Sequence, residues 1–214
     1  MSVSVHKKSN ISDLETKLFT KATQFKSYLI AAATILAISF SSTKNAEASQ
    51  TLHKTITVQN QDIFYREAGV GNAKTIVLLH GFPTSSHMYR DLIPKLANEY
   101  HVIAPDYPGF GNSSMPSLDE FEYSFDNLAK ITDSFLNKIG AQEYTLYVMD
   151  YGAPIGFRIA SAHPERVQGL IIQNGNAYDE GLRDFWLPIK AYWKDKTLEN
   201  AKVLNDSLLH IAAT

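Results

Sequence analysis

The residue that stands out for its chemistry is Asp150, which lies between a β-prone run and a helical pattern. The apolar run 144–149 precedes it, and a helical stretch that contains Gly152 and Gly156 follows. A reactive side chain on such a sharp strand-to-helix turn projects away from the backbone, toward a bound molecule. A carboxylate there can attack a saturated carbon and form an ester, whereas a serine would attack a carbonyl carbon. The alternative role is structural, because aspartate is a favoured N-cap and the helical pattern begins at Tyr151.

The elements around this turn predict an α/β fold with a mostly parallel sheet and helices on both faces. Two β-prone runs, 51–58 and 63–67, are expected to form an antiparallel hairpin at the sheet edge. From Thr75 onward, strands alternate with helices, which is typical of a parallel sheet. The expected strands are 75–79, 101–104, 144–149 and 167–172, of which 75–79 and 167–172 are expected to be buried, and the expected helices are 86–97, 121–139 and 151–162.

Three motifs in this pattern each follow an expected strand. They are His80–Ser86 (HGFPTSS), Ala104–Gly111 (APDYPGFG) and Val148–Gly152 (VMDYG), with PERV at 164–167 leading into the next strand. With these motifs, the region 63–172 resembles the α/β-hydrolase superfamily, and within it the branch of haloalkane dehalogenases and epoxide hydrolases. The resemblance implies that Asp150 is a nucleophile. It forms an alkyl ester that water, activated by a histidine, then hydrolyses. Ligands of open parallel sheets bind at the carboxyl ends of the strands, where all three motifs lie.

The resemblance also assigns roles to the neighbours of Asp150. The backbone N–H groups of Phe82 and Tyr151 are expected to form an oxyanion hole, and both residues are expected to contact substrate. Structural roles are expected for the motif residues His80, Gly81, Asp106 and Gly152, so neither His80 nor Asp106 is assigned to a catalytic triad. Packing or surface positions are expected for His87, His101, His163 and His210, and Ser113 and Ser114 are poor candidates for a nucleophile because they lie in a loop.

Two departures from the dehalogenase pattern leave the substrate open. Tyr151 stands where dehalogenases of this kind usually have a tryptophan, and Phe82 stands where many have an asparagine. In those dehalogenases, the tryptophan and the asparagine hold the leaving halide. Phenylalanine has no hydrogen to donate, and the donor of tyrosine is placed differently. Phe82 is typical of epoxide hydrolases, which also use tyrosines of the cap; Tyr178 and Tyr192 are candidates for that role or for packing. The expected substrate is therefore a small apolar organic molecule, either a haloalkane or an epoxide.

The later part of the expected fold is missing from the sequence. After Asn174 the chain becomes helical and rich in aromatic residues, so residues 49–174 are expected to form the core and 175–214 the start of a helical cap. The resemblance implies an acid after a seventh strand and a histidine after an eighth. We therefore expect an incomplete chain, truncated in the cap region. Two alternatives stay open: an inactive remnant or binding module with this fold, and an ester hydrolase.

The composition of the chain argues against several other classes of function. The chain of 214 residues is 44% hydrophobic and 20% charged, with a formal net charge of −2 and no basic stripe, so a nucleic-acid partner is not expected. It has no cysteine, which excludes disulfides and thiolate metal sites. There is no phosphate-binding loop and no cluster of metal-ligating residues in the sequence, so neither a metal nor an organic cofactor is expected.

The N-terminal segment has the pattern of a secretory signal peptide. Lysines precede an uncharged apolar run of 13 residues, 28–40, and an Ala-Glu-Ala site follows at 46–48. The run is shorter than the ~20 residues that a spanning helix needs. We expect cleavage after Ala48, export to the periplasm or the medium, and no membrane partner afterwards. The alternatives are an uncleaved membrane anchor and a buried helix.

Overall fold

The computed structural model describes residues 50–202 together with Lys26. The chain divides into two units, Met1–Gln50 and Thr51–Thr214, and the second contains the sheet and its helices. The expected signal peptide, 1–48, lies outside the described residues apart from Lys26, and so does His210. No helix in the described part of the chain is long and apolar enough to cross a membrane.

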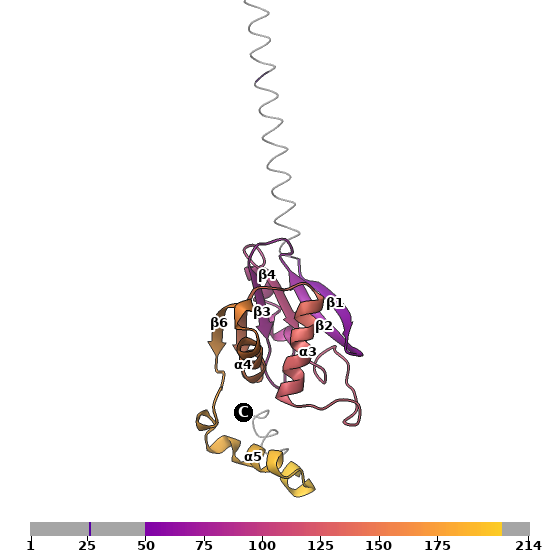
Figure 1. Ribbon diagram of the computed structural model, residues 1–214, viewed down its shortest axis with the longest axis vertical. Helices are drawn as coiled ribbons and strands as arrows, with labels where there is room; N and C mark the ends of the chain where they lie inside the picture. The colour runs from indigo at the N-terminus through magenta and orange to yellow at the C-terminus, as the bar shows by residue number, and fades with distance from the viewer. Residues whose placement is uncertain (1–25, 27–49, 203–214) are drawn as a thin grey trace, which may run out of the picture. The chain divides into compact units, whose positions relative to one another are not determined.

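Six strands form one mixed sheet in the order β1-β2-β4-β3-β5-β6 (Figure 1). Their bounds are β1 Leu52–Val58, β2 Gln61–Ala68, β3 Thr75–Leu79, β4 His101–Pro105, β5 Tyr144–Met149 and β6 Val167–Gln173. The pairs β1–β2 and β2–β4 are antiparallel, whereas the pairs β4–β3, β3–β5 and β5–β6 are parallel. The prediction of a mostly parallel sheet that begins with an edge hairpin is therefore confirmed.

Helices cover both faces of this sheet, as the alternating pattern predicted. The helices α3 (Phe125–Lys138) and α4 (Gly152–Ala162) pack together on one face. The 3₁₀ turn η1 (Ser86–Tyr89) and the short helix α2 (Ile93–Leu96) contact β2, β3 and β4. Successive residues of a strand point to opposite faces, so β3 contributes to two separate apolar clusters.

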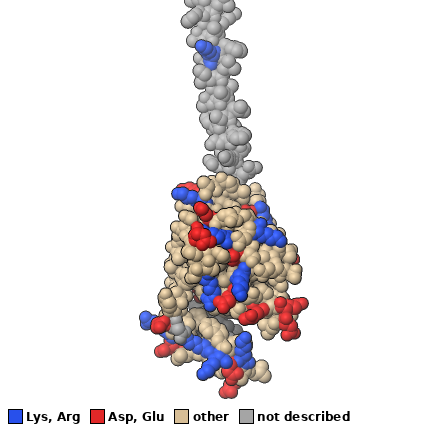
Figure 2. Space-filling model, viewed as in Figure 1, with Lys and Arg blue, Asp and Glu red and all other residues tan. Residues whose placement is uncertain are grey.

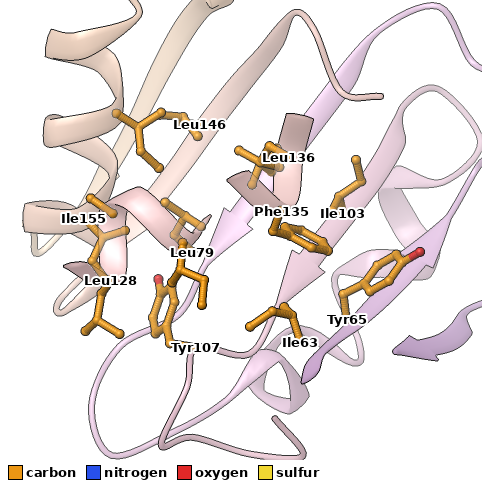
Figure 3. Packing of buried hydrophobic residues seen from close by; sticks show 14 of the residues in the cluster. Ile63, Tyr65, Leu79, Ile103, Tyr107, Leu128, Phe135, Leu136, Leu146 and Ile155 are labelled. Carbon is orange, nitrogen blue, oxygen red and sulfur yellow. The ribbon is translucent and has the colours of Figure 1, made fainter. Parts of the chain in front are cut away.

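Figure 3 shows the larger of the two clusters, in which strand residues meet the inner sides of α3 and α4. Leu79 and Leu146 come from β3 and β5, Phe135 from α3 and Ile155 from α4, and each has no exposed surface. The second cluster joins Leu78 of β3 to residues of η1 and α2. The complete burial of these side chains supplies the main driving force for folding.

Three expectations were wrong in detail. The helix expected over 86–97 is broken into η1 and α2, because Pro94 lacks the N–H that a continuous helix would need. The helix expected from residue 121 begins at Phe125, where the Ser124 hydroxyl accepts a hydrogen bond from the N–H of Asn127 at 3.2 Å. The last strand, β6, is present but not buried, since only β5 pairs with it among the described residues.

Beyond β6, the chain forms a helical segment that contains η3 (Asp179–Gly181), η4 (Asp184–Trp186) and α5 (Leu187–Lys194), shown in orange and yellow in Figure 1. This agrees with the prediction that the pattern changes after Asn174. On the face seen in Figure 2, charged side chains of both signs are interspersed.

Candidate active site

Asp150 lies on the sharp turn between β5 and α4, in the left-handed backbone region with φ +49°. A residue with a Cβ atom adopts this conformation only at a cost, and such strain gathers at functional turns. The N-cap residue of α4 is Tyr151, and no side chain caps the helix. The capping role that was the alternative for Asp150 is therefore not observed.

Two glycines allow the backbone to close around Asp150. A Cβ atom at Gly81 would lie 2.7 Å from the Cβ of Asp150, and one at Gly152 would lie 2.3 Å from the carbonyl oxygen of Leu79. Neither distance is compatible with a larger residue unless the backbone moves. The two glycines thus bring the loop after β3 and the turn after β5 into direct contact.

Both N–H groups expected at an oxyanion hole meet one oxygen of Asp150. The backbone N–H of Phe82 donates to Asp150 Oδ1 at 2.9 Å, and that of Tyr151 donates to the same oxygen at 2.6 Å. Within the described part of the chain, Oδ2 accepts no hydrogen bond. One carboxylate oxygen is therefore fixed by the backbone, while the other keeps its lone pairs available.

His80 is buried, and both nitrogens of its ring form hydrogen bonds. Its Nδ1 donates to the carbonyl oxygen of Gly81 at 3.0 Å, while its Nε2 accepts from the N–H of Tyr107 at 3.4 Å, which requires the neutral ring. Burial lowers the pKa of His80 and so favours the same neutral form. These contacts agree with a structural role for His80 in the loop and leave no nitrogen for a substrate.

Asp106 is also buried, and both its oxygens accept backbone hydrogen bonds. Oδ1 accepts from the N–H of Ser86 at 2.7 Å, and Oδ2 accepts from the N–H of Asn112 at 2.9 Å. Asp106 thus ties the loop after β4 to η1, as expected of a structural residue. The Ser113 hydroxyl donates to the carbonyl oxygen of Asp106 at 2.7 Å, and the Ser114 hydroxyl accepts from a backbone N–H at 2.8 Å, so both serines have structural contacts.

A cavity of about 200 Å³ lies beside Asp150, between the core and the helical segment. Its lining residues are Phe125, Asp150, Tyr151, Pro154, Asn174, Asn176, Ala177, Tyr178, Leu182, Trp186 and Trp193. Asp150 is the charged member of this set, and no histidine, lysine or arginine of the described chain lines the cavity. His87, His101 and His163 lie elsewhere and contact Arg66, Glu67 and Asp133 respectively.

The sequence pattern did not identify every residue of this cavity. Tyr178 lines it, whereas Tyr192 does not. Phe125, Trp186 and Trp193 were not singled out as site residues, because each occurs in an ordinary helical pattern. A sequence signal existed only for the two tryptophans, which belong to the aromatic-rich segment after Asn174.

Tyr151 forms the aromatic wall next to the carboxylate. Its ring centroid lies 4.6 Å from that of Phe125, 5.8 Å from that of Phe110 and 5.9 Å from that of Phe82. Burial raises the pKa of the Tyr151 hydroxyl, and the negative charge of Asp150 raises it further. In the described residues, no group of three or more His, Asp or Glu side chains is arranged to hold a metal ion.

These features define an α/β-hydrolase fold with an aspartate on the strand-to-helix turn. Residues 74–209 match the family model described as alpha/beta hydrolase fold, and the chain belongs to this family. This match covers most of the described chain and supports the superfamily that the three motifs indicated.

Individual relatives place the chain more narrowly. An uncharacterized hydrolase of Saccharomyces cerevisiae is 48% identical over 143 residues, which are 66% of this chain and 49% of that protein. The structure of a haloalkane dehalogenase loop variant from Bradyrhizobium elkanii has a TM-score of 0.58 at 30% identity and covers 64% of this chain and 43% of its own. An epoxide hydrolase mutant of Vigna radiata has a TM-score of 0.52 at 26% identity, over 57% and 38%. The chain spans about half the length of the relatives it matches, or less.

Proposed function

We propose that this chain carries the nucleophilic half of a hydrolase that attacks a saturated carbon and forms a covalent ester on Asp150. The observation that carries the proposal is the division between the oxygens of Asp150. Oδ1 accepts two backbone N–H groups, and Oδ2 accepts no hydrogen bond from the described chain. Asp150 also lines the cavity in which a substrate would lie.

In the first step, a lone pair of Oδ2 attacks the carbon, and the bond to the leaving group breaks with its electron pair. Oδ1 becomes the carbonyl oxygen of the resulting ester. When water later attacks this carbonyl, negative charge develops on Oδ1, where the N–H groups of Phe82 and Tyr151 already point. Donors that are fixed before the reaction stabilise such charge by about 3–4 kcal/mol each. The water needs a general base, and no histidine of the described chain lines the cavity.

The cavity favours small, neutral and apolar substrates. Its walls include the rings of Phe125, Tyr151, Trp186 and Trp193. A substrate with its own carboxylate would meet the charge of Asp150 without a cation among the described lining residues, and like charges repel strongly at low dielectric. Structural similarity to a haloalkane dehalogenase and to an epoxide hydrolase supports alkyl halides and epoxides as the substrate classes.

Trapping the ester tests the proposal directly. The chain is incubated with small bromoalkanes or epoxides, and its peptides are analysed by mass spectrometry. We expect an adduct on the peptide that contains Asp150, which persists because its hydrolysis needs a base, a contribution of roughly 10²–10⁴-fold. Asp150→Asn is the matched control and should give no adduct. An adduct on Ser113 or Ser114 with Asp150 unmodified would show that the nucleophile is wrongly assigned.

The Asp150→Asn variant also distinguishes the proposed function from the alternative of an ester hydrolase. An ester hydrolase with a different nucleophile would still cleave activated esters when Asp150 is replaced. Hydrolysis of such an ester by Asp150→Asn at the wild-type rate would therefore favour the alternative.

A further inference from the structure

The hydroxyl group of Tyr151 lacks a hydrogen-bond partner in the described part of the chain. Four tyrosines of the domain do have a partner: the hydroxyls of Tyr89, Tyr107 and Tyr123 donate to backbone carbonyl oxygens, and that of Tyr147 contacts the Gln173 side chain. A hydroxyl that is sealed from solvent without a partner does occur, at Tyr144, but the Tyr151 oxygen is not sealed in this way. Tyr151 also lines the cavity beside Asp150. Its O–H is thus free to meet a bound molecule.

We propose that the Tyr151 hydroxyl is the acid that protonates the leaving oxygen, which makes epoxides the preferred substrates of this site. The inference rests on the proposed function, because it requires Asp150 to be the nucleophile. It gives the side chain of Tyr151 a role separate from that of its backbone N–H, which donates to Asp150 Oδ1.

The step balances in atoms and electrons. Asp150 Oδ2 forms a bond to one epoxide carbon, and the bond between that carbon and the ring oxygen breaks. The ring oxygen keeps the electron pair and takes the proton of Tyr151 Oη, which leaves a hydroxyalkyl ester on Asp150 and a phenolate on Tyr151. Water returns a proton to the phenolate. No oxidant, reductant or metal enters this step.

The negative charge of Asp150 determines when Tyr151 can release its proton. In the free protein, burial and the Asp150 carboxylate both raise the pKa of the Tyr151 hydroxyl, so it is kept protonated. Attack on the substrate converts the carboxylate into a neutral ester. The repulsion that opposed a phenolate then disappears as the leaving oxygen becomes basic. Asp150 and Tyr151 are therefore coupled through electrostatics as well as through sequence adjacency.

A phenol discriminates between the two leaving groups. Tyrosine ordinarily has a pKa of about 10, which is well below the pKa of water, and an alkoxide is comparable to hydroxide in basicity. Proton transfer from Tyr151 to an alkoxide is therefore downhill. A halide is far too weak a base to accept that proton, so it gains at most one hydrogen bond. Removal of the hydroxyl should consequently harm epoxide opening much more than halide displacement.

The test uses the 214-residue chain and two matched probes, 1,2-epoxybutane and 1-bromobutane. The rate of adduct formation on Asp150 is measured by mass spectrometry for wild type and for Tyr151→Phe, which removes only the hydroxyl and retains the backbone N–H. We expect the epoxide rate to fall roughly 10²–10⁴-fold, the usual contribution of a general acid. The bromobutane rate should fall less than about 10-fold, the value of one ordinary hydrogen bond. In D₂O, only the epoxide reaction of wild type should slow.

Further variants and outcomes show whether Tyr151, Tyr178 or neither residue is the acid. Tyr100→Phe, which alters a tyrosine of the other apolar cluster, should leave both rates unchanged. Equal losses with both probes in Tyr151→Phe, or no loss with the epoxide, would overturn the inference while leaving Asp150 as nucleophile. A loss of epoxide reactivity in Tyr178→Phe, with Tyr151→Phe unaffected, would assign the acid to Tyr178 and also overturn it. No adduct on wild-type Asp150 with either probe would instead refute the proposed function on which it rests.

Discussion

At the scale of single residues, the position of the Asp150 carboxylate depends on two neighbouring residues that have no side chain. Gly81 faces the Cβ of Asp150, and Gly152 faces the carbonyl oxygen of Leu79 at the end of β3. The left-handed backbone of Asp150 is maintained between these two contacts. The glycines therefore set the position of Oδ1 against its two N–H donors, although neither glycine lines the cavity.

Gly152→Ala should disrupt this arrangement. The new Cβ would lie 2.3 Å from the backbone oxygen of Leu79, so β3 or α4 must shift. We expect a loss of about 1–3 kcal/mol in the free energy of unfolding, as for other overpacked sites, together with loss of the Asp150 adduct. Gly169→Ala is the matched control, because its Cβ would meet Thr145 Oγ1 at an ordinary 3.5 Å. Urea denaturation of both variants gives the comparison, and an unchanged midpoint for Gly152→Ala would contradict the prediction.

The site residues that could be recognised from the sequence are those whose structural surroundings are formed by their neighbours in the sequence. Asp150 and Tyr151 follow a strand and precede a helix within a few residues, so their turn is encoded by its neighbours. Phe125 and Trp186 reach the cavity only through the packing of α3 and of the segment after β6. A helical period shows which side of a helix is apolar, but not whether that side meets the core or a cavity.

At the scale of helices and strands, features encoded by neighbouring residues could again be predicted, whereas features that depend on packing could not. The strands expected at 75–79 and 144–149 agree fully with β3 and β5, because buried apolar runs of this length have few alternative structures. The helical spacing of 86–97 does not reveal that Ser85 caps a separate turn and that Pro94 begins a new helix. The burial of β6 could not be predicted from its composition either, because burial depends on which elements cover it.

One ionic cluster joins three strands. Glu67 of β2 accepts from Lys54 of β1 at 2.5 Å and contacts His101 Nε2 of β4 at 2.7 Å. The hydrogen bond with His101, followed by the contacts with Lys54, lowers the pKa of Glu67 below its ordinary value, although burial opposes this shift. A depressed carboxyl pKa means that the ionised form stabilises the folded state.

Glu67→Gln should therefore change how stability depends on pH. The stabilisation from Glu67 is fully present above its unfolded pKa, ordinarily 4.5, and is lost as the pH falls through the lower folded pKa. The thermal midpoint of Glu67→Gln should lie below that of wild type at pH 7, and the two should converge at strongly acidic pH. Glu143→Gln, at an exposed position, is the control and should follow wild type throughout. A difference between Glu67→Gln and wild type that stays constant down to acidic pH would refute this role.

At the scale of the whole chain, the N-terminal segment leads to a prediction about export. Lysines, an apolar run and Ala46-Glu47-Ala48 form the expected order of a signal peptide. We propose that the chain is exported and cleaved after Ala48, so N-terminal sequencing of the periplasmic or secreted product should begin at Ser49. Replacement of Ala48 by a bulky residue should block processing. A product in the cytosol that begins at Met1 or Ser2 would rule out cleavage.

The two edges of the sheet differ in a way that matters for solubility. At one edge, β1 presents polar and charged residues such as His53 and Lys54. At the other, Leu170, Ile171 and Ile172 of β6 are 44%, 45% and 53% exposed, and β5 is the one partner of β6 among the described residues. An apolar edge with unpaired backbone groups is a template for pairing with another chain, and natural sheets commonly protect such edges with charged side chains.

We therefore expect the chain to self-associate through β6, and a charge on that strand should suppress the association. Ile171→Lys places an ammonium group on the open strand, where pairing with a second copy would bury it at high cost. Val70→Lys is the matched control, because Val70 is 62% exposed but lies in the loop after β2. Sedimentation velocity over a concentration series should show that wild type and Val70→Lys associate alike, whereas Ile171→Lys stays monomeric to higher concentration. Equal suppression by both lysines would indicate a general effect of charge, and unchanged association of Ile171→Lys would show that β6 is not the contact.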